Sequence, residues 1–177
     1  MKKVHCLKCG APTKKTGVNL HICPRCDFHY YENPRPTNAV IFENEKKEIL
    51  LVKRAHPPKK GYWDLPGGFA GFNETFEEGA KREIKEELGI SISKLRYIHS
   101  YHNLYLYKGI YYHTLCVTFA SQLPSQTITP KDDVASIRFF RRDAIPFERI
   151  AFAAVKKGLE VYLSSFHQAG KTIQSKE

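Results

Sequence analysis

Residues 68–90 constrain this chain more than any other stretch, because they specify one helix and its charged face. Thr75 can act as the N-cap of that helix, and Glu78 three residues later completes a capping box. Gly89 supplies a left-handed stop after the last turn. Together these signals predict a helix over Phe76–Leu88.

The predicted helix carries an acidic patch beside an apolar stripe. Glu83, Glu86 and Glu87 stand at positions i, i+3 and i+4, so three carboxylates crowd one side of the helix. Like charges at this spacing repel and raise one another's pKa unless a cation lies between them. A hard divalent ion held through oxygens, Mg²⁺ or Mn²⁺, suits such a patch. The alternative is a solvated acidic face on a surface helix, the usual explanation for neighbouring glutamates.

The order of these residues resembles the Nudix box, G-x5-E-x7-R-E-U-x-E-E-x-G-U, where U is aliphatic. Its fixed positions are occupied here by Gly68, Glu74, Arg82, Glu83, Ile84, Glu86, Glu87, Gly89 and Ile90. The preceding YWDLPGG resembles the W-x-x-P-G-G lead-in common in Nudix proteins. The resemblance implies an α/β fold, the Nudix α/β/α sandwich with a mixed sheet. It also implies divalent-metal hydrolysis of a nucleoside diphosphate linked to another group.

The resemblance also implies roles for individual residues. The groups that would bind Mg²⁺ or Mn²⁺ are the carbonyl of Gly68 and the carboxylates of Glu83, Glu86 and Glu87. Arg82 and Glu74 would orient the glutamates through charge-assisted hydrogen bonds. Many Nudix chains have a downstream acid that binds metal or serves as base, and Asp133 is the candidate here. The general base would be Glu86, Glu87 or Asp133, and the sequence does not choose among them. The candidates for substrate contact are Phe42, Arg54, Tyr62 and Trp63, of which Phe42 and Trp63 are of a type more often found in the core.

Runs rich in β-forming residues lie on both sides of the box. Residues 37–43 and Glu48–Arg54 are joined by Asn-Glu-Lys-Lys and predict a hairpin. Residues 94–119 predict two more strands around the turn Lys108-Gly109. In the first of these, apolar residues alternate with tyrosines, which indicates half-buried sheet residues, a base-stacking surface or a dimer interface. Apolar residues at helical spacing over 147–166 predict a packing helix.

Two C-x2-C pairs near the N-terminus predict a tetrahedral Zn²⁺ site formed by Cys6, Cys9, Cys23 and Cys26. A disulfide framework is the alternative, and it fits poorly with a reducing compartment. A segment this short cannot build its own core, so the metal would supply roughly 10 kcal/mol of folding free energy. Four cysteine ligands close the site, which argues against catalytic zinc. Cys116, in an apolar β-like run, is expected in the core.

The zinc ribbon followed by the box resembles the NADH pyrophosphatase group and its relatives. That group has an S-Q-P-W-P-F-P-x-S motif after the box, whereas residues 101–109 read YHNLYLYKG here, so NADH specificity does not carry over. The resemblance implies cleavage of a diphosphate such as ADP-ribose or a dinucleotide such as NAD(H). Alternatives are hydrolysis of oxidised nucleoside triphosphates, a non-catalytic module that binds ADP-ribose or NAD, and RNA decapping with the ribbon as the RNA-specific element.

Length and composition set the organisation that we expect. The chain has 177 residues, of which 42% are hydrophobic, and suits a zinc ribbon over 1–33, a Nudix domain over 34–170 and a flexible tail over 171–177. It has no long apolar run and no signal-like start, so a cytoplasmic protein without a membrane segment is expected. The net charge of +10 favours anionic partners. The basic residues are scattered, so RNA is not specifically indicated, and a homodimer remains open.

Overall fold

The computed structural model describes residues 4–173 and divides the chain into two compact units, Met1–Pro34 and Arg35–Glu177. The division lies one residue beyond the boundary expected from the sequence. Residues 174–177, most of the expected tail, lie outside the described residues.

The first unit is built on a three-stranded antiparallel sheet in the order β1-β2-β3. The strands are only three residues long, namely β1 (Lys14–Thr16), β2 (Leu20–Ile22) and β3 (His29–Tyr31). Cys6 and Cys23, which lie outside these strands, are the unit's buried sulfur residues. Strands this short bury little apolar surface, so the cysteines form the centre of this unit.

The second unit contains a mixed six-stranded sheet in the order β6-β5-β4-β8-β7, with β9 paired to β5. β4 and β8 are parallel, and the other pairs are antiparallel. The strands are β4 (Arg35–Glu43), β5 (Glu48–Arg54), β6 (Trp63–Asp64), β7 (Arg96–Tyr107), β8 (Ile110–Gln122) and β9 (Val134–Arg141). The predicted hairpin at Lys108-Gly109 is confirmed as the β7–β8 connection.

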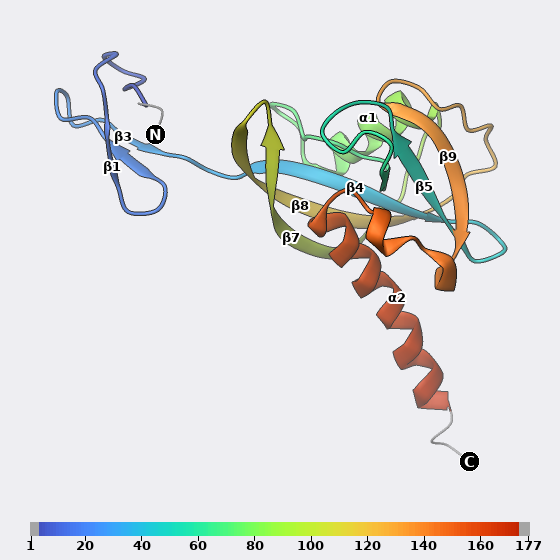
Figure 1. Ribbon diagram of the computed structural model, residues 1–177. Coiled ribbons are helices and arrows are strands. Elements are labelled where there is room, and N and C mark those ends of the chain that lie inside the picture. The colour runs from blue at the N-terminus through green and yellow to red at the C-terminus, as the bar shows by residue number, and fades with distance from the viewer. Residues whose placement is uncertain (1–3, 174–177) are drawn as a thin grey trace. The chain divides into compact units, whose positions relative to one another are not determined.

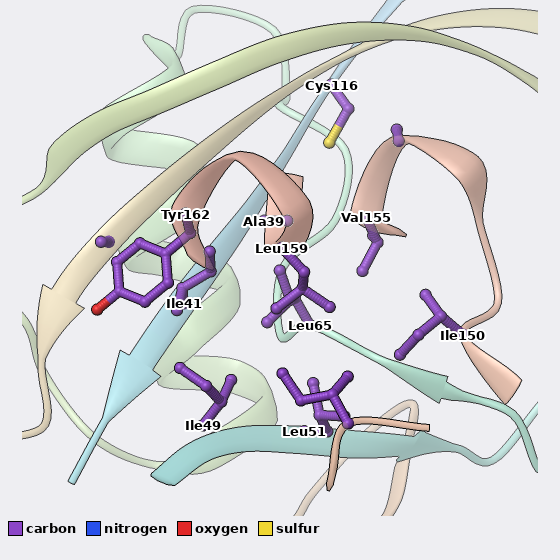
Figure 2. Packing of buried hydrophobic residues seen from close by; sticks show 13 residues of the cluster. Ala39, Ile41, Ile49, Leu51, Leu65, Cys116, Ile150, Val155, Leu159 and Tyr162 are labelled. Carbon is purple, nitrogen blue, oxygen red and sulfur yellow. The ribbon is translucent and has the colours of Figure 1, made fainter. Parts of the chain in front are cut away.

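Two helices, α1 (Phe76–Leu88) and α2 (Ala153–Ile173), cover opposite faces of this sheet (Figure 1). β4 contributes side chains to the hydrophobic clusters on both faces of the sheet. Ala39 and Ile41 belong to the cluster that includes α2, and Val40 and Phe42 belong to the cluster that includes α1. Leu159 and Tyr162 of α2 lie over the aliphatic side chains of β4 and β5 (Figure 2). The expected α/β/α sandwich is therefore confirmed.

The boundaries of α1 are those that the sequence predicts. The Thr75 side chain accepts a hydrogen bond from the backbone N–H of Glu78 at 3.1 Å, and the Glu78 carboxylate accepts one from the Thr75 N–H at 2.8 Å. Gly89 ends the helix in the left-handed conformation with φ 71°. The helix buries Ala80, Ile84 and Leu88, and Glu87 is buried as well.

β4 and β5 form the predicted hairpin only at its turn, where Glu43 pairs with Ile49. Beyond that pair, residues 66–70 lie next to β4 in the position that β5 would otherwise occupy. Val40 donates its N–H to the carbonyl of Pro66 at 2.9 Å, and Asn38 donates to that of Gly68 at 2.8 Å. This insertion separates β4 from β5 and opens the space in which the candidate site lies.

The helix predicted over 147–166 begins later than its apolar spacing indicates. A 3-10 turn occupies Phe147–Arg149, and α2 starts at Ala153. Between them Ala151 donates its N–H to the carbonyl of Trp63 at 2.8 Å, and Ile150 pairs with Trp63 as an isolated bridge. This pairing with a sheet strand holds residues 150–151 out of the helix.

Glu43, at the end of β4, joins three parts of the second unit. Both of its carboxylate oxygens accept from Arg142 at 2.7 Å, and one accepts from the hydroxyl of Tyr162 at 2.9 Å. Burial alone would raise the pKa of Glu43, but the bonds from Arg142 and Tyr162 outweigh it and lower that pKa. The carboxylate therefore stabilises the folded state.

We predict that Glu43→Gln lowers the free energy of unfolding by about 1–3 kcal/mol at pH 7. The pKa of Glu43 is lower in the folded than in the unfolded chain, so its contribution is complete above the unfolded value and is lost as the pH falls through the folded value. Denaturant titrations between pH 7 and pH 3 should show the difference from wild type shrinking toward acid. Glu45→Gln, an exposed change in the same turn, is the control. A difference that stays constant down to pH 3 would contradict the assignment.

Candidate functional site

A cavity of about 210 Å³ opens where residues 66–70 separate β4 from β5. It has an acidic end, an aromatic wall and a wall of neutral hydrogen-bonding groups. The acidic residues that line it are Asp64, Glu83, Glu87, Asp132 and Asp133. Among the described residues that line the cavity, Arg54 is the only basic one. The cavity therefore combines excess negative charge with one fixed cation.

Glu87 and Glu83 project from α1 into the acidic end. Glu87 is only 7% exposed, and its carboxylate accepts the N–H of Gly67 at 2.9 Å. Burial, together with the neighbouring charges of Glu83, Asp64 and Asp133, raises the pKa of Glu87 to about 8 against the opposing effect of the Gly67 bond. Burial also raises the pKa of Glu83 although Arg82 opposes it. Clustered carboxyl groups with raised pKa values are what a divalent cation stabilises in ionised form, and oxygen is the ligand that Mg²⁺ and Mn²⁺ prefer. The residues present fit such an ion.

Arg82 connects the carboxylates of the box. Its guanidinium donates to both oxygens of Glu74, at 2.7 and 3.1 Å. It also donates to Glu83 and Glu86 at 2.9 Å each, and to the carbonyl of Phe69 at 2.9 Å. The Arg82 bond lowers the pKa of Glu74 to about 2, with help from the N–H of Gly71. One arginine therefore fixes the direction of three carboxylates.

Glu86 is placed differently from its neighbours. Its side chain is 47% exposed, it bonds to Arg82, and it is not among the residues that line the cavity. Glu83, Glu87 and Gly68 do line it. The structure thus brings together three members of the expected Mg²⁺ set, and Glu86 as a ligand stays a prediction.

The glycines before the box allow this close approach. A Cβ on Gly68 would lie 2.6 Å from the carboxyl carbon of Glu83. Gly67 has φ 139°, and a Cβ there would clash with the carbonyl oxygen of Asn38. The carbonyl of Gly68, an expected metal ligand, accepts the N–H of Asn38 and has a second lone pair. Side chains at either glycine would push the loop away from β4 and from Glu83.

Arg54 lies in the cavity as expected, and Asp64 is its buried partner. Arg54 donates to the carboxylate of Asp64 at 3.1 Å and to the carbonyl of Pro58 at 2.9 Å. Burial raises the pKa of Asp64 to about 6 despite the attraction of Arg54. The sequence interpretation missed Asp64. The available signal was a single charged residue within the otherwise uncharged YWDLPGG.

Three aromatic side chains, Phe69, Tyr105 and Phe152, also line the cavity. The ring of Tyr105 lies 5.8 Å from that of Phe69, nearly perpendicular to it, and 5.6 Å from that of Phe152. Tyr105 comes from the alternating tyrosines of β7, which were predicted as sheet residues, a stacking surface or a dimer interface. Its position in the cavity is compatible with stacking on a base.

Asp133 also reaches the cavity, from the loop before β9. Its side chain is 61% exposed and lies 3.9 Å from the ring nitrogen of His56. The backbone of Ala55 bonds to its carbonyl at 2.8 Å, which fixes the loop beside the end of β5. The downstream acid expected from the sequence is therefore near Glu87, and its role stays a prediction.

Three of the expected substrate contacts are not brought to the cavity. Phe42 is fully buried under α1, so its prediction as a substrate contact is wrong: the alternation of β4 turns it into the core. Trp63 packs edge-on against Phe140, with 5.0 Å between ring centroids. The cationic groups of Lys59 and Arg149 lie 5.1 and 4.9 Å from the ring centroid of Tyr62. Neither Trp63 nor Tyr62 lines the cavity.

The four N-terminal cysteines gather in the first unit. Their sulfur atoms all lie within 4.8 Å of one another, and the Cys6–Cys26 and Cys9–Cys23 pairs are each 3.6 Å apart. A disulfide requires about 2.05 Å, so the sulfurs are separate thiols. Among the residues that the structure describes, these cysteines are the only group of three or more His, Cys, Asp or Glu side chains whose ligand atoms lie this close together. Cys116 is buried in the core of the second unit, as expected.

Within residues 4–173, no helix combines the length and apolarity needed to cross a bilayer.

Known proteins resemble this chain in sequence and in structure. The NUDIX domain family matches residues 33–159. The NAD-capped RNA hydrolase NudC of Haemophilus influenzae is 38% identical over 98 residues, which are 54% of this chain and 37% of that protein. The ADP-ribose pyrophosphatase of Methanocaldococcus jannaschii is 32% identical over 133 residues, 71% of each protein. The crystal structure of a NUDIX hydrolase from Nitrosomonas europaea aligns with a TM-score of 0.70 and 30% identity, over 93% of this chain and 92% of that one.

These similarities differ in how much of each relative they cover. The chain spans little more than a third of the NudC proteins, so their complete activity is not transferred with the match. The family match, in contrast, includes β4, the box, the cavity residues and the start of α2. The resemblance predicted from the box is confirmed: the chain belongs to the Nudix family.

Proposed function

We propose that this protein is a Mg²⁺-dependent pyrophosphatase that cleaves the diphosphate bond of a nucleoside diphosphate derivative, with ADP-ribose or a dinucleotide as substrate. The observation that carries the proposal is the cavity in which Glu83 and Glu87 stand at one end, near Arg54 and an aromatic wall. A base linked to a diphosphate has both an aromatic face and adjacent negative charge. The relatives named for ADP-ribose and NAD-capped RNA act on compounds of this class.

Each part of the cavity has a proposed role. Glu83 and Glu87, with the carbonyl of Gly68, would hold the divalent cation, and Glu86 would join them after release from Arg82. When bound, the cation supplies charge neutralisation of the diphosphate and an acidified water molecule. Arg54, held by Asp64, would contact a phosphate oxygen. Tyr105 and Phe152 would stack on the base. Of the three candidates for the general base, Glu87 and Asp133 line the cavity and Glu86 does not, which favours the first two.

The four cysteines are proposed to hold one structural Zn²⁺. Their number leaves no coordination position for a reacting water, as in structural zinc sites generally. Thiols bind metal only while reduced, which supports the proposed cytoplasmic location. A homodimer stays a proposal. RNA as part of the substrate also stays a proposal, and the substrate panel below tests it.

We predict that kcat/KM for ADP-ribose or NADH exceeds that for 8-oxo-dGTP by tenfold or more in the presence of Mg²⁺. The panel should also contain a diadenosine polyphosphate and NAD-capped RNA, with the products identified.

Glu87→Gln should lower kcat by about a hundredfold or more with the fold intact, because it removes charge from the cation site. Glu77→Gln, an exposed change on the same helix, is the matched control.

Different results point to the alternatives. A tenfold preference for 8-oxo-dGTP would indicate a triphosphate pyrophosphohydrolase, and binding of ADP-ribose without turnover would indicate a binding module. Cleavage confined to capped RNA, with affinity that falls steeply as salt rises, would indicate a decapping enzyme. Near wild-type turnover in Glu87→Gln would remove this glutamate from the cation site.

We predict that Arg82→Lys lowers kcat about 10- to 100-fold and leaves the fold intact. A lysine has a single ammonium group and cannot bond Glu74 through two nitrogens while also holding Glu83 and Glu86. Steady-state kinetics and circular dichroism measure the two parts of the prediction. Arg96→Lys, an exposed change outside the cavity, is the control. Unchanged kcat in Arg82→Lys would show that the arginine does not position the glutamates.

We predict about one equivalent of zinc per chain, lost in Cys6→Ser together with a lower Tm for the first unit. Elemental analysis of purified protein measures the metal. Cys116→Ser changes a cysteine outside the cluster and should retain zinc. Full zinc content in Cys6→Ser would contradict the four-cysteine site.

A further inference from the structure

The hairpin of β7 and β8 carries aromatic side chains outward from the cavity along one face. Residues two apart on a strand share a face, so Asn103, Tyr105 and Tyr107 project from the same side of β7. The first two line the cavity, and Tyr107 is the next residue of that face toward the turn. The ring centroids of Tyr105 and Tyr107 lie 6.4 Å apart, with 28° between the ring planes. The aromatic lining of the cavity therefore continues beyond it.

Tyr112 of β8 adds a third ring to this face. It pairs in register with Tyr105, and residues directly opposite in an antiparallel pair lie on the same face of the sheet. Tyr107 is 41% exposed, and Tyr112 is partly exposed. We call Tyr105, Tyr107 and Tyr112 the tyrosine track. It begins in the cavity and ends beside the turn of the hairpin.

Two cations accompany the tyrosine track. The guanidinium of Arg35 lies 4.2 Å from the ring centroid of Tyr112, and the ammonium of Lys108 lies 5.3 Å from that of Tyr107. Both side chains belong to exposed residues, and within the described part of the chain neither forms an ion pair with a carboxylate. Residues 96–122, which cover both strands and the turn, contain no aspartate or glutamate. The charge on this face is therefore positive and available to an anion.

Aromatic rings with cations beside them fit a single-stranded nucleotide chain. Its bases stack on aromatic rings, and its phosphates need positive charge next to those rings. Every base has a face that can stack, so a surface of this kind tolerates different sequences. The flexible stem of Lys108 lets its ammonium exchange the ring of Tyr107 for a phosphate.

A second copy of this chain fits the same face less well. Two copies paired through it would bring their cations into one interface, and the hairpin has no carboxylate to pair with them. The exposed leucines of the hairpin, Leu104, Leu106 and Leu115, lie on its opposite face together with Tyr111. The aliphatic surface that a protein partner would bury is therefore on the other side.

We propose that the tyrosine track is a binding surface for a single-stranded nucleotide chain attached to the diphosphate compound in the cavity. The assignment rests on the proposed function and extends it from free dinucleotides to dinucleotides that form the end of such a chain. The nucleotides that follow the diphosphate stack on Tyr107 and Tyr112, with their phosphates at Lys108 and Arg35. The track supplies affinity for the chain, and the cavity supplies the reaction.

The test compares two substrates on three proteins. The substrates are NAD and an RNA of about ten nucleotides that begins with NAD, so they differ only in the chain. Wild-type protein should prefer the RNA by about tenfold or more in kcat/KM, because the added bases stack. In Tyr107→Leu that ratio should fall by about fivefold or more. Tyr111→Leu removes an exposed tyrosine from the opposite face of the same hairpin and should keep the wild-type ratio.

Salt dependence gives a second measurement, on the same RNA without its cap. Each cation that neutralises a phosphate of a single strand contributes about 0.7 to the slope of log affinity against log salt. Lys108→Gln and Arg35→Gln should each lower the slope by about that amount in fluorescence anisotropy titrations. Lys46→Gln, an exposed change in the turn between β4 and β5, is the control and should leave the slope unchanged.

Each other outcome overturns the assignment. A wild-type ratio near one means that the chain is not bound, and an equal fall in Tyr107→Leu and Tyr111→Leu means that the track is not the surface that binds it. A wild-type dimer that Tyr107→Leu dissociates in size-exclusion chromatography, with the ratio unchanged, gives this face to a second copy. If wild-type protein cleaves neither compound, the proposed function fails independently. The salt slopes for the uncapped RNA then decide, and equal slopes in wild type, Lys108→Gln and Arg35→Gln overturn the assignment.

Discussion

The hydrogen bonds between β4 and residues 66–70 are the constraint on which the rest of the second unit depends. These residues take the position beside β4 that β5 would otherwise occupy, with bonds from Val40 to Pro66 and from Asn38 to Gly68. Within the one sheet, β5 with β6 and β9 stays joined to β4 with β8 and β7 only through the pair Glu43 and Ile49. The cavity lies where residues 66–70 separate β4 from β5. Gly67 and Gly68 permit it, because a side chain at either would meet β4 or Glu83.

Arg82 and the turn at Gly67 then determine where negative charge lies. Adjacent glutamates on one helix differ in direction by about 100°. Glu87 therefore turns inward to the N–H of Gly67, whereas Glu86 turns outward to Arg82. The inward carboxyl has a raised pKa through burial, and the outward one is half-exposed. Two residues with the same chemistry thus have different environments through their position on the helix alone.

The parts that could be predicted from the sequence depend on contacts between near neighbours. The caps of α1, the β7–β8 hairpin and the cysteine pairs all have local signals, and all are found as expected. Asp64 was missed because its significance arises from its ion pair with Arg54 and from its place in the cavity, both of which exist only in the folded chain. Phe42 was misjudged for a similar reason. The sequence of a strand does not show whether an aromatic residue faces a ligand or a helix, and the position of α1 decides that Phe42 is a core residue. The late start of α2 likewise reflects the pairing of Ile150 with Trp63.

The charge of the whole chain and the charge of the cavity have opposite signs, and this contrast limits how an anionic substrate can bind. The chain has a net charge of +10, which attracts polyphosphates from solution. The cavity, in contrast, is lined by five acidic residues and only Arg54 as a cation among the described lining residues. A diphosphate that entered alone would meet carboxylates in a partly buried space where repulsion is weakly screened. Under the proposed function, binding of the diphosphate and binding of the divalent cation would therefore favour each other, because each supplies the charge that stabilises the other in the cavity.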